Sequence, residues 1–455
     1  MTFYVTTAIP YVNAAPHLGH ALELVQADVL ARHRRLRGEP VRFLTGTDDN
    51  AQKNVSAARD AGVPVADFVR ANGDRFAALR EPLELSFDDF IRTAEPRHRT
   101  GVTALWHRSE HDFYRRTYEG LYCPGCEQFT DSCTEHRGPL ELVREENWFF
   151  RLSRYEQPIR EILESGRVRV EPAARRNEVL AFVRSGLADI SVSRQARGWG
   201  IPVPGDPGQV IYVWWDALAN YVTALAGADQ QRWWTGSDER VHVIGKGIVR
   251  FHAVYWLALL LSAGETLPTT ILVHDYLTAG GAKISKSAGT AVDPIGLIDG
   301  YGANALRWWL LSEVAPLGDT DFTVDRLIAR HDRDLANGIG NLVNRVLKLA
   351  PDEPGEYSGD LPARIDRALA TGDFRAASSA IAEEVDRGNR LVEAERPWQL
   401  DGTRRTEVLA ELLARCQVVA RELQPFLPSA ATELTAQLAG QAGRKPVFTR
   451  LRPRR

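Results

Sequence analysis

The chain has 455 residues, of which 44% are apolar and 25% charged, and its single methionine is the first residue. These fractions are typical of a globular protein and exclude a disordered or fibrous chain. Its 56 basic and 59 acidic side chains give a net charge of -3. Binding to RNA or to a membrane therefore depends on local patches, because the protein as a whole carries no strong field. The length predicts about three domains.

Cysteine usage and the N-terminus predict a cytoplasmic protein. Three of the four cysteines lie within residues 123–133, which is unlike the disulfide framework of a secreted protein. The N-terminus lacks the basic start and long apolar run of a signal peptide. The longest apolar run, residues 253–263, is about half as long as a membrane-spanning helix and predicts a buried core helix. We therefore expect no membrane partner.

The first part of the chain alternates strands and helices. Apolar spacing predicts a strand at 3–9, a helix over 17–37, a second strand at 41–46, and helices over 51–61 and 66–79. This alternation is typical of a parallel, nucleotide-binding sheet.

The pattern changes near residue 113, where short β-like runs predict a domain inserted between two halves of the sheet. Strands at 210–215, 241–245 and 271–277 continue the α/β pattern, and helical patterns fill the chain from residue 324. The predicted fold is α/β: a Rossmann-type, doubly wound catalytic domain with an inserted domain and a C-terminal α-helical bundle. The predicted boundaries are 1–112 for the first half of the catalytic domain, 113–207 for the insertion, 208–270 for the second half, 271–325 for a connecting segment with a lysine loop, and 326–455 for the bundle.

Two histidines, His17 and His20, flank Gly19 at the start of the first predicted helix. At this spacing both imidazoles lie on one face of the first turn, where unpaired N–H groups and the helix dipole favour phosphate. Gly19 leaves room for a nucleotide to approach the backbone. Taken alone, such a tetrapeptide is more often a pair of surface histidines.

A second polar segment, residues 281–287, reads Gly-Ala-Lys-Ile-Ser-Lys-Ser. Its two lysines and two serines form a cationic loop suited to a triphosphate whose charge rises as pyrophosphate leaves. Taken alone, it is more often a solvated loop. It is not a Walker loop, and no Gly-x-Gly-x-x-Gly follows the first strand.

Two Cys-x-x-ligand turns lie close together in the predicted insertion. Cys123, Cys126, Cys133 and His136 have the spacing of a closed, structural Zn²⁺ site with three thiolates and one imidazole. The alternative is three reduced thiols and an unrelated histidine. Cys416 is predicted to be a buried helix residue.

The histidine pair and the lysine loop, about 265 residues apart, resemble the HIGH and KMSKS signatures of class I aminoacyl-tRNA synthetases. The chain resembles the methionyl family of these enzymes over essentially its full length, and a single zinc knuckle resembles one subset of that family. The segments that carry the resemblance are 8–13, 45–48, 212–217, 244–246 and 251–256.

The resemblance implies a ligase that activates L-methionine with ATP and Mg²⁺ and transfers it to the terminal 2′-hydroxyl of initiator and elongator methionine tRNA. It implies that Asp48 binds the ammonium group. An aromatic surrounding suits an unbranched thioether, although such residues are more often plain core. The implied catalytic residues are His17, His20, Lys283 and Lys286; ATP also contacts Gly19, Gly245, Ser285 and Ser287; and the amino-acid side chain contacts Ile9, Tyr11, Trp214, Ala217, Leu218, Tyr221, Ile248, His252 and Trp256.

Asn337, Asn341 and Arg345 follow each other at helical i, i+4 and i+8 spacing, as a stripe roughly 12 Å long. Such a stripe is usually the solvated face of a helix, but the resemblance implies that it reads the anticodon. The aromatic residue that the family places near the C-terminal end to stack on a base is expected to be missing, with Phe448 as a candidate substitute. The basic tail, 444–455, either contacts RNA phosphate or is a disordered end.

Three segments depart from the family pattern. Asp-Asp-Asn-Ala at 48–51 replaces Asp-Glu-His-Gly, Gly247 replaces an aspartate, and Ile284 replaces the methionine of the lysine loop by a residue of similar volume. Asn50, Ala51 and Gly247 motivate an alternative, a diverged paralogue with another amino acid or a non-tRNA acceptor. A non-catalytic RNA-binding protein is a third possibility. We expect a monomer, because the sequence ends soon after the bundle.

Overall fold

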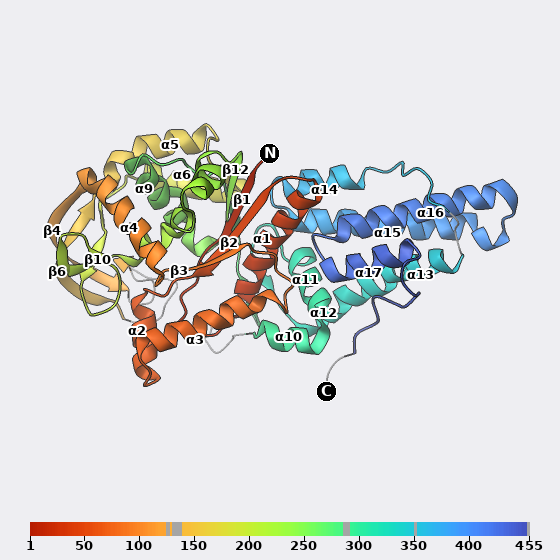
Figure 1. Ribbon diagram of the computed structural model, residues 1–455, viewed down its shortest axis with the longest axis horizontal. Coiled ribbons are helices and arrows are strands. Elements are labelled where there is room, and N and C mark those ends of the chain that lie inside the picture. The colour runs from red at the N-terminus through yellow and green to blue at the C-terminus, as the bar shows by residue number, and fades with distance from the viewer. Residues whose placement is uncertain (124–127, 130–138, 285–291, 350–352, 453–455) are drawn as a thin grey trace. The chain divides into compact units, whose positions relative to one another are not determined.

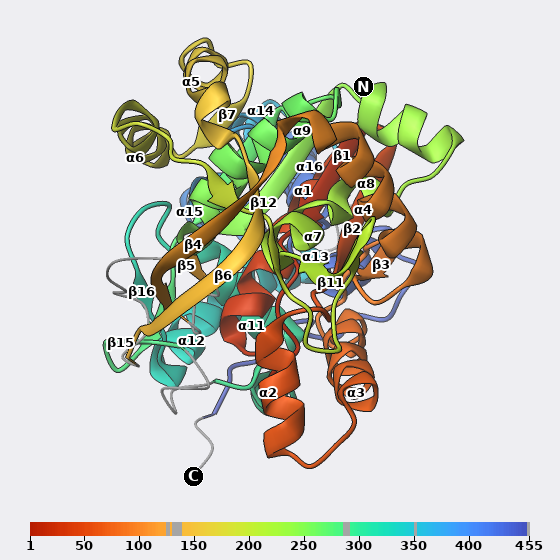
Figure 2. The same cartoon turned by 90° about the vertical axis from the view of Figure 1, so that its left-hand side faces the viewer.

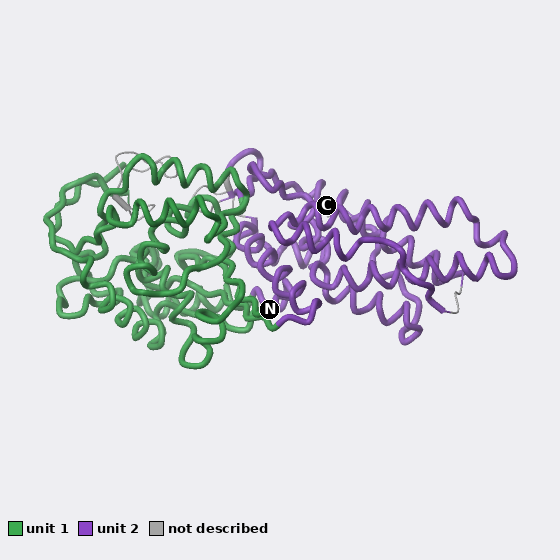
Figure 3. The backbone as a smooth tube through the Cα atoms, turned by 90° about the horizontal axis from the view of Figure 1, so that it is seen from above, with its two compact units in different colours: residues 1–16, 40–78, 87–274 green, residues 17–39, 79–86, 275–455 purple. Residues whose placement is uncertain are grey.

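The computed structural model describes residues 1–123, 128–129, 139–284, 292–349 and 353–452 (Figure 1). The chain forms two compact units (Figure 3). Unit 1 comprises Met1–Pro16, Pro40–Ala78 and Phe87–His274, and unit 2 comprises His17–Glu39, Leu79–Ser86 and Asp275–Arg455. The five-part division predicted from the sequence stays a prediction.

Unit 1 is built on a six-stranded parallel sheet of order β3-β2-β1-β12-β13-β7. The central strand pairs on both sides, with Val5 opposite Phe43 and Val241. All its residues are buried, as expected for a parallel strand covered on both faces. The strands are β1 (Phe3–Thr7), β2 (Val41–Thr47), β3 (Asp89–Arg92), β7 (Arg169–Glu171), β12 (Glu239–Gly245) and β13 (Thr270–His274).

The strand order reverses between β1 and β12, so the predicted doubly wound sheet is confirmed. Ligands of such sheets usually bind at the carboxyl ends of the strands beside this reversal. The loop after β1 starts there, and the backbone N–H of Ala8 donates to the carbonyl of Val243 in β12, at 3.2 Å. Residues that follow β1, β2, β3 and β12 are therefore placed to form a site.

Helices of unit 1 confirm the predicted alternation. The apolar run 253–263 is largely buried, as predicted, and begins as a π-helix before it continues as α9. The helices are α2 (Gln52–Asp60), α3 (Val65–Ala77), η1 (Ala78–Arg80, its last two residues in unit 2), α4 (Pro96–Ser109), η2 (Glu110–Asp112), η3 (Leu152–Tyr155), α5 (Glu156–Glu164), α6 (Ala173–Arg184), α7 (Val213–Leu218), α8 (Asn220–Thr223), η4 (Gln230–Thr235), η5 (Lys246–Ile248), η6 (Phe251–Trp256) and α9 (Leu257–Ser262).

The middle of unit 1 contains two antiparallel sheets. A long ribbon, β4 (Phe113–Cys123) with β6 (Glu141–Phe150), is conspicuous in Figure 2 and is flanked by β5 (Gln128–Phe129) and β8 (Ile190–Ser191). The second sheet has the order β10-β11-β9. Its strands are β9 (Ser193–Gln195), β10 (Pro202–Val203) and β11 (Asp206–Ile211).

Two strand predictions need correction. The strand expected at 210–215 ends at Ile211 within the small antiparallel sheet, and helix α7 starts at Val213. A short apolar run is compatible with either a buried strand or a buried helix, so its pattern could not separate them. The strand expected at 271–277 is two strands, because β13 ends at His274 and a new strand starts at Leu277. The edge strand β7 lies within the predicted insertion but pairs with β13.

Unit 2 is mainly helical, which confirms the predicted C-terminal bundle. Its two longest helices in the bundle, α15 and α16, pack side by side (Figure 1). None of the helices in the described residues is long and apolar enough to cross a membrane. The elements are α1 (Leu18–Leu36), β14 (Leu277–Ala279), β15 (Ala282–Lys283), α10 (Pro294–Tyr301), α11 (Ala303–Ser312), β16 (Thr320–Asp321), α12 (Val324–His331), η7 (Asp332–Gly340), α13 (Asn341–Lys348), α14 (Leu361–Leu369), α15 (Phe374–Glu395), η8 (Pro397–Gln399), α16 (Gly402–Leu423) and α17 (Pro428–Leu438).

Candidate active site

The carboxylate of Asp48 lies fully buried at the carboxyl edge of the sheet, directly after β2. Its backbone N–H donates to the carbonyl of Pro10, at 2.9 Å, and the residue forms a parallel bridge with Tyr11. Its Oδ1 accepts hydrogen bonds from the backbone N–H of Asn50, at 3.0 Å, and from the hydroxyl of Thr93, at 3.3 Å. Segments after three strands therefore fix a carboxylate whose charge favours a cationic partner.

Aromatic side chains from two segments of unit 1 stack on each other. Trp214 of α7 and Phe251 of η6 lie face to face, with ring centroids 3.6 Å apart and planes 15° apart. The ring of Tyr11 lies 6.4 Å from that of Trp214. Phe251 was missed as a site residue, although it starts one of the segments that carry the family resemblance. Polarizable aromatic faces are favourable contacts for a thioether.

Tyr221 and His252 form a buried hydrogen-bonded pair. The Tyr221 hydroxyl lies 2.7 Å from Nε2 of His252, whose Nδ1 lies 3.0 Å from the carbonyl of Ile248. Because a carbonyl only accepts, Nδ1 carries the proton and Nε2 accepts from the tyrosine. Burial lowers the pKa of His252 to about 4, so the imidazole is neutral at neutral pH. This neutral pair places polar atoms beside the hydrophobic core to which Tyr221 and Trp256 belong.

His242 of β12 contacts Tyr221 of this pair, and sequence analysis did not identify it. Its ring stacks on Tyr221 at 4.1 Å. Nε2 accepts a hydrogen bond from the indole N–H of Trp256, at 3.2 Å, so Nδ1 donates to the hydroxyl of Thr6, at 2.7 Å. Burial lowers the pKa of His242 well below its usual value. Its sequence signal is weak, because a polar residue inside an apolar strand has no distinctive spacing.

The other predicted contacts of the amino-acid side chain lie in the same unit. Leu218, Tyr221 and Trp256 share one hydrophobic core, and Trp214 and Ile248 pack against it. Ala217 is buried in α7, Ile9 is half-buried in the loop after β1, Gly245 ends β12 beside the reversal of the sheet, and Gly247 is exposed.

The predicted histidine pair starts helix α1 of unit 2, and the structure confirms that both rings lie together. The rings of His17 and His20 stack at 3.8 Å. Nδ1 of His17 accepts from the backbone N–H of Gly19, and Nδ1 of His20 accepts from the backbone N–H of His17, both at 3.1 Å. Each neutral ring therefore carries its proton on Nε2. A Cβ at Gly19 would lie only 3.0 Å from the His17 ring and would push the ring aside. Glycine at this position therefore allows the ring to stay where it is.

The predicted lysine loop begins on a β-hairpin of unit 2. Lys283 ends β15, after a turn in which Gly280 and Gly281 have φ of 60° and 77°. Asp321 fixes the turn by accepting hydrogen bonds from the N–H of Gly281, at 3.0 Å, and the hydroxyl of Thr278, at 2.8 Å. Ile284, which replaces the family's methionine, is buried. Ser285, Lys286 and Ser287 lie outside the described residues.

The predicted zinc ligands are described only in part. Cys123 is buried at the end of β4, whereas Cys126, Cys133 and His136 lie outside the described residues. In the part of the chain that the structure describes, no group of three or more His, Cys, Asp or Glu is arranged for a metal ion. Cys416 is buried in α16, as predicted, and burial raises its pKa to about 12.

The predicted RNA-reading stripe lies on two successive helices. Asn337 and Asn341 are exposed and Arg345 is half-buried. The first helix, η7, is a π-helix, so the expected α-helical spacing from Asn337 to Asn341 is wrong: a π-turn is wider than an α-turn. Arg345 lies 3.4 Å from the side-chain oxygen of Asn389 and 3.6 Å from the carboxylate of Glu393, both on α15.

Phe448, the candidate substitute for the stacking aromatic residue, is poorly placed for that role. Phe448 is buried and packs edge-on against His331, with centroids 6.4 Å apart, so its faces are not available to a base. Trp398 is 54% exposed and lies just after α15, the helix that contacts Arg345. This tryptophan follows Pro397 directly and lies farther from the C-terminus than the segment in which sequence analysis expects a stacking residue.

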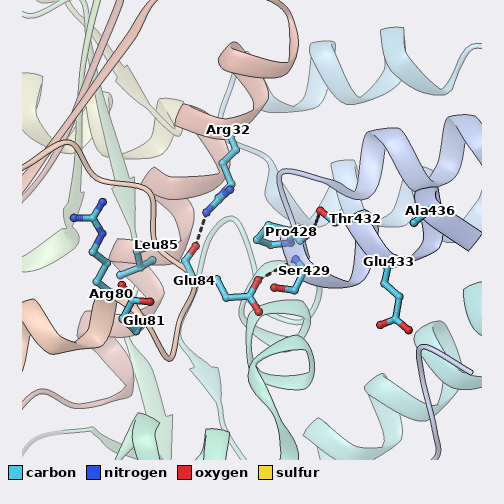
Figure 4. A pocket seen from close by; sticks show the side chains of 10 residues that line it. All are labelled: Arg32, Arg80, Glu81, Glu84, Leu85, Pro428, Ser429, Thr432, Glu433 and Ala436. Carbon is cyan, nitrogen blue, oxygen red and sulfur yellow. Dashed lines mark hydrogen bonds between the residues drawn. The ribbon is translucent and has the colours of Figure 1, made fainter. Parts of the chain in front are cut away.

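A hollow of about 610 Å³ lies elsewhere in unit 2 and contains none of the predicted site residues (Figure 4). Glu84 crosses it: its carbonyl accepts from Arg32, and its carboxylate accepts from the backbone N–H of Ser429, at 3.1 Å. Other residues that line it are Arg80, Glu81, Leu85, Pro428, Thr432, Glu433 and Ala436.

The parallel sheet, the buried carboxylate and the histidine pair agree with a family model described as "tRNA synthetases class I (M)", which matches residues 3–140 and 130–347. These features define an aminoacyl-tRNA synthetase of class I. The chain is 38% identical over 507 residues to a methionine--tRNA ligase of Rhizobium meliloti (strain 1021), with 98% of both chains covered. It is 38% identical over 478 residues to that of Synechocystis sp., with 96% of this chain and 89% of the relative covered.

Solved structures agree with these relatives. A crystal structure of Mycobacterium tuberculosis methionyl-tRNA synthetase bound by methionyl-adenylate matches 100% of this chain and 99% of its own, with a TM-score of 0.89 and 34% sequence identity. The chain therefore belongs to the methionine--tRNA ligase family.

Proposed function

We propose that unit 1 recognises L-methionine through two features of its own side chains. Asp48 binds the α-ammonium group, because a buried carboxylate attracts a cation strongly where little water screens its charge. The aromatic side chains Tyr11, Trp214 and Phe251, with the neutral Tyr221–His252 pair, contact the thioether. The observation that carries this proposal is the buried carboxylate at the carboxyl end of β2, bridged to Tyr11 beside the aromatic residues of the same unit.

Activation of the carboxylate by ATP is assigned to the two signatures. The substrate carboxylate is already a nucleophile, so the step needs alignment and charge stabilisation more than a base. The Nε2–H groups of His17 and His20 donate to phosphate oxygens at the start of α1, and Lys283 and Lys286 neutralise the departing pyrophosphate. ATP enters with its Mg²⁺. Gly19, Gly245, Ser285 and Ser287 complete the predicted nucleotide contacts.

Transfer to the 2′-hydroxyl of the terminal adenosine of methionine tRNA completes the reaction in this proposal. Asn337, Asn341 and Arg345 contact unstacked bases, because amides and guanidinium groups hydrogen-bond base edges. Trp398 stacks on one base, an inference supported by its exposure and by its position directly after the helix that contacts Arg345. In this proposal the protein acts in the cytoplasm, as a monomer.

A structural Zn²⁺ is part of the same proposal. Cys123, Cys126, Cys133 and His136 would hold it, and the burial of Cys123 fits a closed site with thiolate ligands. When bound, the metal ties two short turns together and supplies no chemistry to the reaction.

Pyrophosphate exchange tests the amino-acid assignment. We expect exchange that depends on L-methionine, and Asp48→Asn lowers kcat/KM for methionine at least about 100-fold, because a charged hydrogen bond to the ammonium is lost. Asp60→Asn, on an exposed residue of α2, serves as the matched control and keeps the unmodified rate. Faster exchange with another amino acid would support the diverged paralogue motivated by Asn50, Ala51 and Gly247.

A further inference from the structure

A network of hydrogen bonds between buried polar groups extends from Asp48 into the interior of unit 1. The backbone N–H of Asn50 donates to Asp48, and its side-chain amide donates to the carbonyl of Thr93, at 3.1 Å, and to Oδ2 of Asp216, at 2.7 Å. Both hydrogens of the amide nitrogen thus have fixed acceptors. Asn50 therefore links the carboxylate of Asp48 to the carboxylate of Asp216.

The hydrogen-bond network continues from Asp216, which lies in α7 close to the predicted pocket residues Trp214 and Ala217. Its Oδ1 lies 2.6 Å from Nε2 of His98 in α4, and Nδ1 of His98 lies 2.6 Å from the hydroxyl of Thr223 in α8. The side chains of His98 and Asp216 are 0% and 1% exposed. Since a carboxylate only accepts, His98 donates through Nε2.

We propose that Asn50, Asp216 and His98 are positioning residues that hold Asp48 in the orientation that binds the α-ammonium group. The proposal rests on the proposed role of Asp48 and goes beyond it, because it assigns the three residues a role that acts through Asp48. Their contribution is to fix the direction of the acceptor oxygen: Asn50 anchors the segment after β2 to helix α7, and His98 anchors Asp216 in turn.

The identity of residue 50 fits this role. Asn50 replaces the histidine of the family pattern, and an amide supplies two donors from one nitrogen without introducing a titratable cation. It therefore bonds Thr93 and Asp216 at the same time and adds no titratable group of its own beside the ammonium site. Removal of the amide leaves Asp216 with one donor fewer in a buried position, which is unfavourable.

The test compares two acids that differ only in the ammonium group. L-methionine and 4-(methylthio)butanoic acid are titrated into the full chain, and the ratio of their dissociation constants reports the ammonium contact alone. For Asn50→Ala and for Asp216→Asn, we expect L-methionine to bind about tenfold more weakly and the desamino acid to bind within about twofold of the unmodified chain. Asn147→Ala, a buried asparagine of β6, is the matched control and leaves the ratio unchanged.

Two results would overturn the positioning role: an unchanged affinity for L-methionine in both variants, or an equal loss for both acids. Asp216→Asn preserves side-chain volume and carries the test if Asn50→Ala lowers the unfolding temperature. An unmodified chain that does not prefer L-methionine over the desamino acid contradicts the proposed role of Asp48 itself, which distinguishes failure of the function from failure of this inference.

Discussion

Asp48 and Asp49 follow β2 directly, and both side chains are buried but have different hydrogen-bond partners. Asp48 is surrounded by donors from Asn50 and Thr93, whereas Asp49 accepts from the hydroxyl of Thr47, at 2.9 Å. Desolvation by burial raises the pKa of Asp49 to about 6. Ionised Asp49 therefore reduces the stability of the fold at neutral pH, directly beside Asp48.

Asp49→Asn tests this cost. An acid whose folded-state pKa is raised from 3.8 to about 6 contributes stability below pH 3.8 and loses it as the pH rises through 6. We expect the free energy of unfolding of the variant, relative to the unmodified chain, to increase by up to about 3 kcal/mol between pH 3.5 and pH 7.5. Urea unfolding at both pH values measures it.

Both proteins contain His252, whose lowered pKa acts in the opposite direction, so its contribution cancels in the difference. Asp60→Asn, exposed on α2, is the matched control for the loss of one carboxylate near the same sheet. A difference for Asp49→Asn that is the same at both pH values would contradict the raised pKa.

The residues of the site were predictable to different degrees. His17 and His20 carry a spacing that forces both rings onto one helix face, and they lie together. His242 and Phe251 were missed because their roles depend on partners from other elements, such as Thr6 and Trp214, which no local pattern reveals.

At the scale of elements, wide helical turns explain several differences from expectation. The π-helices η6 and η7 carry His252 and Asn337, and apolar residues in a π-turn do not recur at the α-helical period. A helix could therefore be predicted at both places, but the direction of each side chain could not. β7 was also not predictable as a sheet strand, because its three residues are too few to show a period.

Helix α1, which begins with the histidine pair, is anchored by a buried arginine of α11. The Arg307 guanidinium donates to Asp28 of α1, at 2.9 Å, and to the carbonyls of Leu83, Pro425 and Phe426, at 2.7 to 3.0 Å. The side chains of Arg307 and Asp28 are both 0% exposed.

Arg307→Ala should lower the free energy of unfolding by about 3–5 kcal/mol, because a buried carboxylate loses a partner and three carbonyls lose a donor. Equilibrium urea unfolding measures the change. Arg333→Ala is the control: this arginine is 64% exposed, and its buried partner Asp334 keeps its contacts with Arg330 and Trp308, so we expect a loss of less than about 1 kcal/mol. Similar losses in both variants would show that Arg307 has no anchoring role.

The zinc knuckle is a second prediction at this scale. A tetrahedral site with four protein ligands implies about one Zn²⁺ per chain, measured as metal content of the purified protein. Cys126→Ser should abolish the zinc content. Cys416→Ala changes a cysteine that is buried in α16 and should leave the zinc content unchanged. Metal-free unmodified protein, or full zinc content in Cys126→Ser, would refute the predicted ligand set.

At the scale of the whole molecule, the class of fold and the helical C-terminal part followed from the sequence, but the division into units did not. Helix α1 belongs to unit 2 although β1 and β2, its neighbours in the chain, belong to unit 1. The contacts responsible are long-range: Arg37 at the end of α1 binds Glu422 of α16 through two hydrogen bonds, at 3.0 and 2.6 Å. Such pairs become visible only in three dimensions.

Recognition of tRNA gives a prediction for unit 2 as a whole. Trp398→Ala should weaken binding of methionine tRNA about 10- to 100-fold, because stacking of a base on an aromatic ring contributes about 1–3 kcal/mol. Methionine-dependent pyrophosphate exchange should not change. Leu317→Ala, on another exposed apolar residue of unit 2, is the control for loss of surface area. Equal tRNA affinity of Trp398→Ala and the unmodified chain would exclude the stacking role.

Aminoacylation of purified tRNA shows directly whether the protein charges methionine tRNA. The unmodified chain, supplied with ATP, Mg²⁺ and L-methionine, is predicted to charge both initiator and elongator methionine tRNA, and to leave a valine tRNA uncharged. Absence of methionine charging on both methionine tRNAs, with active pyrophosphate exchange for a different amino acid, would contradict the account.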